Sequence, residues 1–167
     1  MSSSAQISAI FLLIIGIFRA TNCFIPDQAP DSDLPSGFVE FPDVNVAYKV
    51  YTEKLSWDDA ARKCNEVGGQ LALIDTRRKI SHIAGIKPNG AYVWVGIKRT
   101  EERAPWRKIS DGSPMVDVPW APGKPTAGSN NCLTVRGCNR GLSNERCTQR
   151  KVFACEISLI QQGLLQS

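Results

Sequence analysis

Apolar residues spaced three or four positions apart predict two short helices. Ser56 is a suitable N-cap for the first helix, and the glycine pair at 68–69 ends it. The apolar side of this helix consists of Trp57, Ala60, Ala61 and Cys64. The second helix begins after Asp75 or Thr76 and ends before Pro88. Its apolar side consists of Ile80, Ile83 and Ala84. Each helix therefore has one face for a core, and Cys64 is expected to point inward.

Short apolar runs predict strands around these helices. The runs are residues 48–52, 71–74, 92–97, 133–135 and 152–154. Residues 98–131, here named the long loop, are instead dominated by turn-forming residues, and Trp106 and Trp120 are expected to pin this segment to the core. Ordering so long a segment without a core of its own costs entropy, so a loop of this kind is usually functional.

The first residues of the chain predict export from the cell. Residues 10–18 form an apolar run that is too short for a membrane span of roughly 20 residues, and prolines and acidic residues follow. We therefore expect residues 1–23 to be a secretory signal peptide, the mature protein to be secreted, and no stable membrane insertion. Residues 24–45 are rich in proline and aspartate and predict a linker or an extended arm. The tail 158–167 covers either the base of the domain or a partner.

The chain offers no set of residues for catalysis. It has one histidine, His82, which falls off the apolar side of its helix, and no nucleophile motif or cluster of metal ligands accompanies it. We therefore expect a protein that is not an enzyme and carries no cofactor. The six cysteines of an exported chain are most simply disulfide partners, because no Cys-x-x-Cys pair indicates a zinc site.

Positive charge is concentrated late in the chain. The net charge is +4, and between residues 121 and 151 six basic residues stand against one acidic residue. The basic residues are Lys124, Arg136, Arg140, Arg146, Arg150 and Lys151. Such a local field favours an anionic partner, although a solvated basic face without a partner gives the same pattern. Nucleic acid is not expected, because stacking aromatic residues are not interleaved with the basic ones.

Several motifs follow one another in a recognisable order along residues 46–157. They are Trp94-Val95-Gly96-Ile97, Trp106, Ser110-Asp111-Gly112-Ser113-Pro114, Trp120, Gly123-x-Pro125 and Phe153-Ala154-Cys155-Glu156, together with Cys64, Cys132 and Cys147. This set resembles the C-type lectin-like domain, and most of all the small secreted lectins of arthropods. The resemblance implies an α+β fold with two helices, short antiparallel sheets and a long ligand loop supported by a disulfide.

The resemblance also implies how the cysteines pair. It assigns Cys64 to Cys155 and Cys132 to Cys147. Cys138 has no partner in the family pattern. It pairs with Cys23 if that residue survives processing, stays free, or bridges a homodimer. The sequence leaves these three outcomes open.

The calcium and sugar site of the family is altered in this sequence. Sugar-binding members carry Glu-Pro-Asn or Gln-Pro-Asp where Lys124-Pro125-Thr126 stands, and a carboxylate where Asn130 stands. The last pair of ligands falls on Asn144-Glu145 with a one-residue gap, which we favour, or on Ser143-Asn144 without the gap. Calcium needs about six to eight oxygen ligands, several of them anionic, so calcium is not expected here. Lys124 either pairs with Glu145 and holds the loop without metal, or points to water.

These features predict a secreted recognition protein that binds carbohydrate, either microbial or anionic glycans, with a degenerate calcium site. The ligand-binding candidates are Lys124, Thr126, Asn130, Asn144, Glu145, Arg136, Arg140 and Arg146. An alternative from a different class is a calcium-independent module that binds a partner protein. A third is a sugar binder that recruits calcium despite the substitutions.

Overall fold

The computed structural model describes residues 34–137 and 141–160. The predictions for residues 1–33, for Cys138 and Arg140, and for the tail beyond residue 160 lie outside the described residues. Within that part of the chain, no helix is long and apolar enough to cross a membrane. The elements in chain order are β1 (Val39–Phe41), η1 (Pro42–Val44), β2 (Val46–Leu55), α1 (Trp57–Glu66), β3 (Gln70–Leu71), α2 (Arg77–Ile86), β4 (Val93–Lys98), β5 (Arg107–Lys108), β6 (Cys132–Val135), β7 (Leu142–Glu145) and β8 (Lys151–Ser158).

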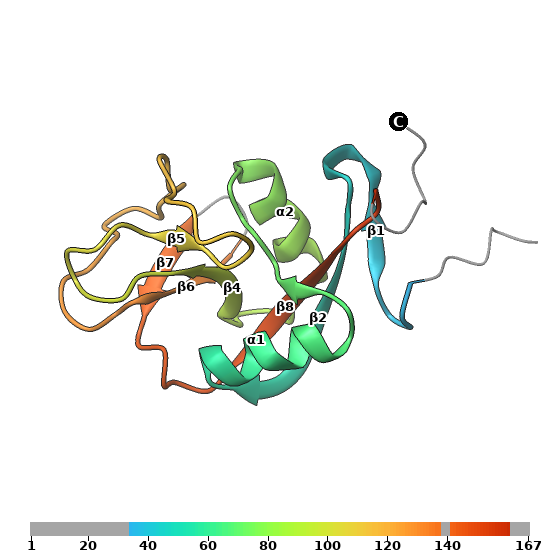
Figure 1. Ribbon diagram of the computed structural model, residues 1–167, viewed down its shortest axis with the longest axis horizontal. Helices are drawn as coiled ribbons and strands as arrows, with labels where there is room; N and C mark the ends of the chain where they lie inside the picture. Colours follow the sequence, from blue (N-terminus) through green and yellow to red (C-terminus); the bar gives the residue numbers. More distant parts are fainter. Residues whose placement is uncertain (1–33, 138–140, 161–167) are drawn as a thin grey trace, which may run out of the picture. The chain divides into compact units, whose positions relative to one another are not determined.

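The strands form one connected sheet in the order β1-β2-β8-β4-β6-β7, while β3 pairs with β8 and β5 pairs with β4. All pairs are antiparallel except β4 and β8, which run parallel with Val93 opposite Val152. The last strand therefore lies between β2 and β4, and Figure 1 shows β8 and β2 side by side. The long loop leaves from the end of β4 and returns to the sheet at β6.

Both predicted helices are confirmed, and side-chain caps fix where they begin. The Ser56 side chain accepts a hydrogen bond from the backbone N–H of Asp59 at the start of α1. At the start of α2 the cap is Thr76 rather than Asp75, because the Thr76 hydroxyl accepts from the backbone N–H of Lys79 at 3.3 Å. Such caps satisfy backbone donors that have no partner within the helix.

The predicted strand at 71–74 is confirmed only at Leu71, because β3 ends there and the backbone of Leu73 bonds to a side chain. The backbone N–H of Ala72 donates to the carbonyl of Ala154, whereas that of Leu73 donates to the buried side chain of Glu156 at 2.9 Å. Three strands were not predicted, and one of them, β5, lies within the long loop. The sequence of β7 is Leu-Ser-Asn-Glu, and its polar residues give no apolar strand pattern. β1 lies within the residues predicted as an arm, and its Val39 pairs with Tyr48.

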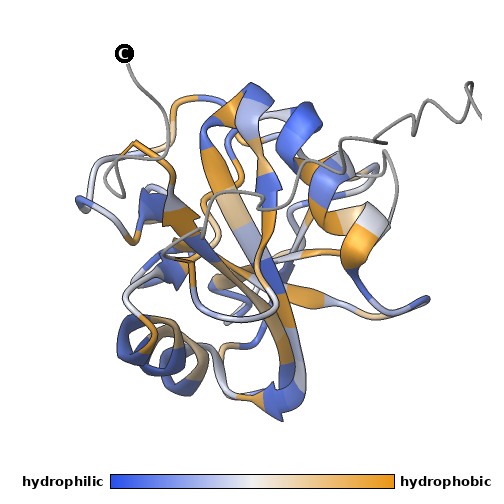
Figure 2. Cartoon of the chain, turned by 90° about the vertical axis from the view of Figure 1, so that its right-hand side faces the viewer, coloured by the Kyte–Doolittle hydropathy of each residue, from blue (hydrophilic) through white to orange (hydrophobic). Residues whose placement is uncertain are grey.

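The core consists of two clusters, each built around one helix. The cluster under α2 contains Ile80 and Ile83 with apolar residues of β2, β4 and β6. The cluster under α1 contains Trp57, Trp94 and Phe153 around the disulfide between Cys64 and Cys155. Figure 2 shows the mainly hydrophobic central strands between hydrophilic outer faces of the helices. Burying these apolar faces is the main favourable contribution to folding.

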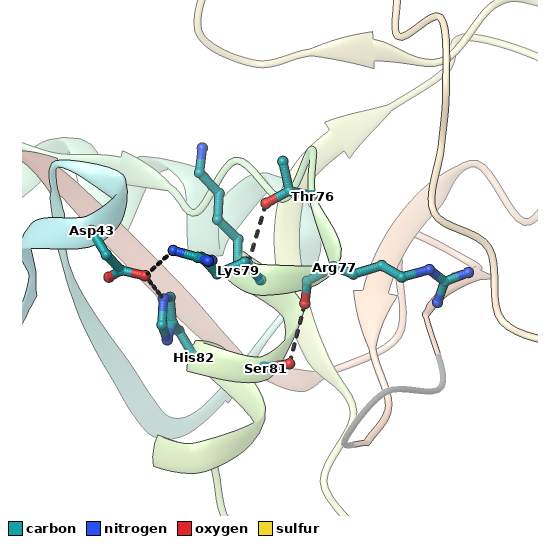
Figure 3. Close-up of polar contacts among 7 residues, drawn as sticks. Asp43, Thr76, Arg77, Lys79, Ser81 and His82 are labelled. Carbon is teal, nitrogen blue, oxygen red and sulfur yellow. Dashed lines mark hydrogen bonds and ion pairs between the residues drawn. The ribbon is translucent and has the colours of Figure 1, made fainter.

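The segment before β2 is attached to α2 through His82. The carboxylate of Asp43 accepts hydrogen bonds from the His82 ring nitrogen at 2.9 Å and from Arg78 at 3.4 Å (Figure 3). The His82 ring also packs on Phe41, with 4.3 Å between ring centroids. Burial raises the pKa of Asp43, but the hydrogen bond from His82 and the charges of His82 and Arg78 outweigh it, so the net pKa is lowered. His82 therefore has a structural contact that links the first strand to the second helix.

Candidate functional site

Arg99 organises the long loop from its first turn. Arg99 is 9% exposed, and its Nε donates to the Asn131 Oδ1 at 2.9 Å. The same guanidinium donates to the backbone carbonyls of Glu102 and, at 3.3 Å, of Gly128. Its carbon Cζ lies 4.6 Å from the ring centroid of Trp106. Arginine can hold several oxygens at once because its donors form a planar fork. One side chain thus joins both ends of the loop.

Aromatic packing and a disulfide fix the rest of the loop. Trp106 and Trp120 meet edge to face with 5.3 Å between ring centroids, and both pack against the core cluster under α2. The prediction that these two tryptophans pin the loop is confirmed. The disulfide between Cys132 and Cys147 closes the return of the loop to the sheet, as the family resemblance implies. The long loop is therefore ordered by contacts of the chain itself.

Asn144 closes the part of the loop where the family resemblance predicts an altered calcium site. Its side chain is 1% exposed and extends from β7 to Thr126. The Asn144 Oδ1 accepts from the Thr126 backbone N–H at 2.8 Å and from the Thr126 hydroxyl at 3.2 Å. Its Nδ2 donates to the backbone carbonyls of Thr126 at 2.7 Å and Asn130 at 3.1 Å. An amide has two donor hydrogens and an acceptor oxygen with two lone pairs, so all four positions are used.

Of the two alternatives for Lys124, the structure does not show the ion pair with Glu145. The register of β6 and β7 places Glu145 opposite Cys132, and its carboxylate lies 3.7 Å from the Lys151 ammonium instead. Among the residues that the structure describes, Lys124 makes no ion pair, and its peptide bond to Pro125 is cis. Asn144 belongs to both alignments of the last ligand pair, so its contact with Thr126 does not choose between them.

The basic candidates do not converge on one site. Arg136 follows β6 at the end away from Cys132, and its Cζ lies 5.2 Å from the ring centroid of Tyr92. Arg146 is exposed just after β7, and Arg140 lies outside the described residues. Thr126 and Asn130 do meet, because the Asn130 Nδ2 donates to the Thr126 hydroxyl at 3.3 Å. The structure therefore joins Thr126, Asn130 and Asn144 and separates them from Arg136.

Two features of the site were not predicted from the sequence. The contacts of Arg99 reach residues 29 and 32 positions further along the chain, and only the fold brings these groups together. The saturation of Asn144 depends on the register of β7. A partial signal for Arg99 exists, since it is a charged residue directly after a buried strand.

Comparisons with known proteins agree with this geometry. Residues 53–157 match the sequence profile of the lectin C-type domain. The chain belongs to the C-type lectin domain family. C-type lectin lectoxin-Lio3 of Erythrolamprus poecilogyrus is 34% identical over 135 residues, which are 75% of this chain and 82% of that protein. Snaclec 3 of Sistrurus catenatus edwardsii is 28% identical over 86% of this chain and 97% of its own length.

Solved structures with this C-type lectin fold include both a protein described as calcium-independent and a complex with a glycan. A calcium-independent type II antifreeze protein superposes with a TM-score of 0.66 at 21% identity, covering 78% of this chain and 98% of that one. The lectin domain of murine dendritic cell inhibitory receptor 2, solved with an N-glycan, gives 0.64 at 22% identity over 74% and 98%. At these identities the likeness shows the fold alone.

Proposed function

We propose that this C-type lectin domain is a secreted, non-enzymatic recognition protein that binds anionic glycans without calcium at the usual family site. The observation that carries this proposal is the saturation of Asn144, whose amide is fully used by Thr126 and Asn130. In the proposed state the loop keeps its shape without an ion. The ligand is then recognised by charge and hydrogen bonds rather than through a bridging metal.

The residues at the calcium position do not fit the ion. Calcium prefers six to eight oxygen ligands, and a bound Asn144 would have to give up its contacts to Thr126. Lys124 adds a positive charge at this position. At 4 Å and an effective dielectric constant of about 20, a pair of unit charges repels by roughly 4 kcal/mol. Among the described residues, no three His, Cys, Asp or Glu side chains are grouped to hold a metal.

The charge of the chain supports an anionic ligand. The net charge is +4, and basic residues are in excess between residues 121 and 151. Two of them, Arg136 and Lys151, make cation–π contacts with the ring of Tyr92. Arginine and lysine bind sulfate, phosphate and carboxylate groups through charge-assisted hydrogen bonds. Surface charge also speeds the encounter with an oppositely charged ligand.

A glycan array with the purified protein tests the proposal. We expect binding to sulfated or phosphorylated glycans that persists in EDTA and falls in high salt, because screening weakens charge pairs at the surface. Loss of binding in EDTA supports the reading in which calcium is recruited despite the substitutions. Absence of binding to any glycan overturns the proposed function.

Calcium titration by calorimetry tests the loop directly. We expect no heat of binding for the parent protein. The variant Lys124→Glu/Thr126→Asn/Asn130→Glu restores oxygen ligands at the family positions and is expected to bind the ion. Tight calcium binding by the parent contradicts the proposal. Heat from the variant alone supports the assignment of Lys124, Thr126 and Asn130 to the altered ligand positions.

A second candidate, binding to a partner protein, is favoured by one exposed side chain. Val116 in the long loop is 91% exposed, the highest value among the exposed large apolar residues that the structure describes. Pull-down from the body fluid of the source animal, with Val116→Ser as control, distinguishes this candidate from glycan binding. Non-reducing gels of the parent and Cys138→Ser variants test the proposed homodimer through Cys138.

A further inference from the structure

A pocket of about 600 Å³ lies at the start of β4, whereas the long loop leaves from the end of that strand. Its walls come from β2, from the segment 88–91 that joins α2 to β4, and from the start of β8. The wall carries three basic side chains and a phenol ring, from Lys54, Arg150, Lys151 and Tyr92. None of the described residues that line the pocket is acidic. This pocket has the volume of a small-molecule site and lies outside the altered calcium loop.

The cations of this pocket are available to a ligand. Lys54 and Arg150 are exposed, and neither makes an ion pair within the described residues. Lys151 is 16% exposed at its side chain and lies 3.7 Å from the Glu145 carboxylate, near the outer limit for an ion pair. The pocket thus gathers three positive charges, and the nearby carboxylates are those of Glu145 beside Lys151 and of Asp59, which interacts with the charge of Arg150. Gathering like charges is unfavourable unless an anion is bound among them.

Tyr92 holds two cations at the rim of the pocket. The Lys151 ammonium lies 5.0 Å from the centroid of the Tyr92 ring, and the Arg136 Cζ lies 5.2 Å from it. Contacts of this kind orient a flexible basic side chain at little cost. Arg136, one of the predicted ligand residues, therefore belongs with this pocket rather than with Thr126 and Asn144.

We propose that the Tyr92 pocket is the anion-binding site of this protein and takes a sugar ring esterified with sulfate or phosphate. Lys54, Arg150 and Lys151 bind the ester oxygens, and Arg136 adds charge at the rim. Guanidinium and ammonium groups match the tetrahedral oxyanion, and the volume of the pocket suits a sugar residue. This inference rests on the proposed function and moves its principal contact from the long loop to the start of β4.

Paired charge variants of the full chain test the proposal. The probes are a sulfated hexasaccharide, its desulfated counterpart and a phosphorylated mannose oligosaccharide. We expect Lys54→Gln/Arg150→Gln to weaken binding of the esterified probe at least about tenfold, since a hydrogen bond to a charged group is worth about 1.5–3 kcal/mol. Arg77→Gln/Arg103→Gln removes the same charge from exposed residues elsewhere and is expected to change affinity less than about twofold. Far-ultraviolet circular dichroism and thermal unfolding check that each variant is folded.

The outcomes separate this inference from the proposed function. Binding of either esterified probe, lost in the pocket pair and kept in the charge-matched pair, supports the Tyr92 pocket. Equal loss in both pairs, or loss only in Lys124→Gln/Arg146→Gln near the long loop, overturns the pocket and leaves the proposed function standing. Binding of the desulfated probe as tightly as the sulfated one also overturns the pocket. A parent protein that binds none of the three probes overturns both.

Discussion

Asn144 and Thr126 are joined by three hydrogen bonds across 18 positions of sequence. The amide of Asn144 accepts from the Thr126 N–H and hydroxyl and donates to the Thr126 carbonyl, so the buried end of β7 fastens the long loop. The family resemblance assigns this position to a calcium ligand, and here the amide of Asn144 is fully used within the chain. The long loop is thus held by the residue whose side-chain oxygen a calcium ion would require.

Removing the side chain of Asn144 is expected to destabilise the domain. Asn144→Ala leaves the N–H and carbonyl of Thr126 and the carbonyl of Asn130 without their partner, and we expect a loss of about 2–4 kcal/mol in the free energy of unfolding. Urea denaturation followed by tryptophan fluorescence measures the change. Asn130→Ala is the comparison, because its half-exposed side chain makes only contacts of 3.3 Å, and it should cost less than about 1 kcal/mol. Equal losses in the two variants contradict the special role of Asn144.

Replacing Arg99 by lysine tests whether the shape of the guanidinium matters. Lysine keeps the charge but cannot donate to Asn131, Glu102 and Gly128 in one plane, so Arg99→Lys should cost about 2 kcal/mol of unfolding free energy. Hydrogen exchange is expected to speed up at Gly128, whose N–H donates to the Glu102 carboxylate beside this network. Arg103→Lys, at an exposed position of the same loop, is the control and should change neither quantity.

Glu156 predicts a measurable dependence of stability on pH. Desolvation raises the pKa of this buried carboxyl above its ordinary value of 4.5, against the hydrogen bonds from Gln70 and Leu73 and the charge of Lys79. The folded state therefore binds the proton more tightly, and the stability linked to Glu156 is full below pH 4.5 and is lost as pH rises through the raised pKa.

The variant Glu156→Gln removes this titration. We expect it to be more stable than the parent in mildly alkaline solution and to lose that advantage on acidification towards pH 4.5, as measured by thermal unfolding across pH. Glu101→Gln at an exposed position is the control, with no such trend expected. A difference between Glu156→Gln and the parent that is constant across pH argues against a raised pKa.

The two disulfides are expected to contribute unequally. Cys132 and Cys147 are separated by 15 positions, and Cys64 and Cys155 by 91. In the chain-entropy account, removing the shorter link as a Cys132→Ala/Cys147→Ala variant should cost about 3 kcal/mol, and removing the longer link about 4–5 kcal/mol. Guanidinium denaturation of the two double variants measures both values. A shorter link whose removal costs nothing would mean that Arg99 and Asn144 suffice to hold the loop.

Local patterns in the sequence were enough for the elements whose signals are local. Ser56 could be recognised as a cap, and the second cap could be narrowed to Asp75 or Thr76, because a cap needs only the residues of its own first turn. The strand around Trp94 could be recognised because a buried strand is continuously apolar. The same apolar pattern gave a wrong prediction for most of segment 71–74. Its backbone bonds partly to the side chain of Glu156, which is 83 positions away from Leu73.

The sequence by itself determined the family, the two helices, the tryptophans that hold the long loop and the loss of the family's acidic residues at Lys124 and Asn130. Only the tertiary structure decided which partners these residues have. The register of β6 and β7 turned Glu145 towards Lys151, and the fold placed Arg136 beside Tyr92, far along the chain from Lys54. The physical reason is that ion pairs, saturated amides and pockets depend on distances between strands, and a strand register is set by packing of the whole sheet.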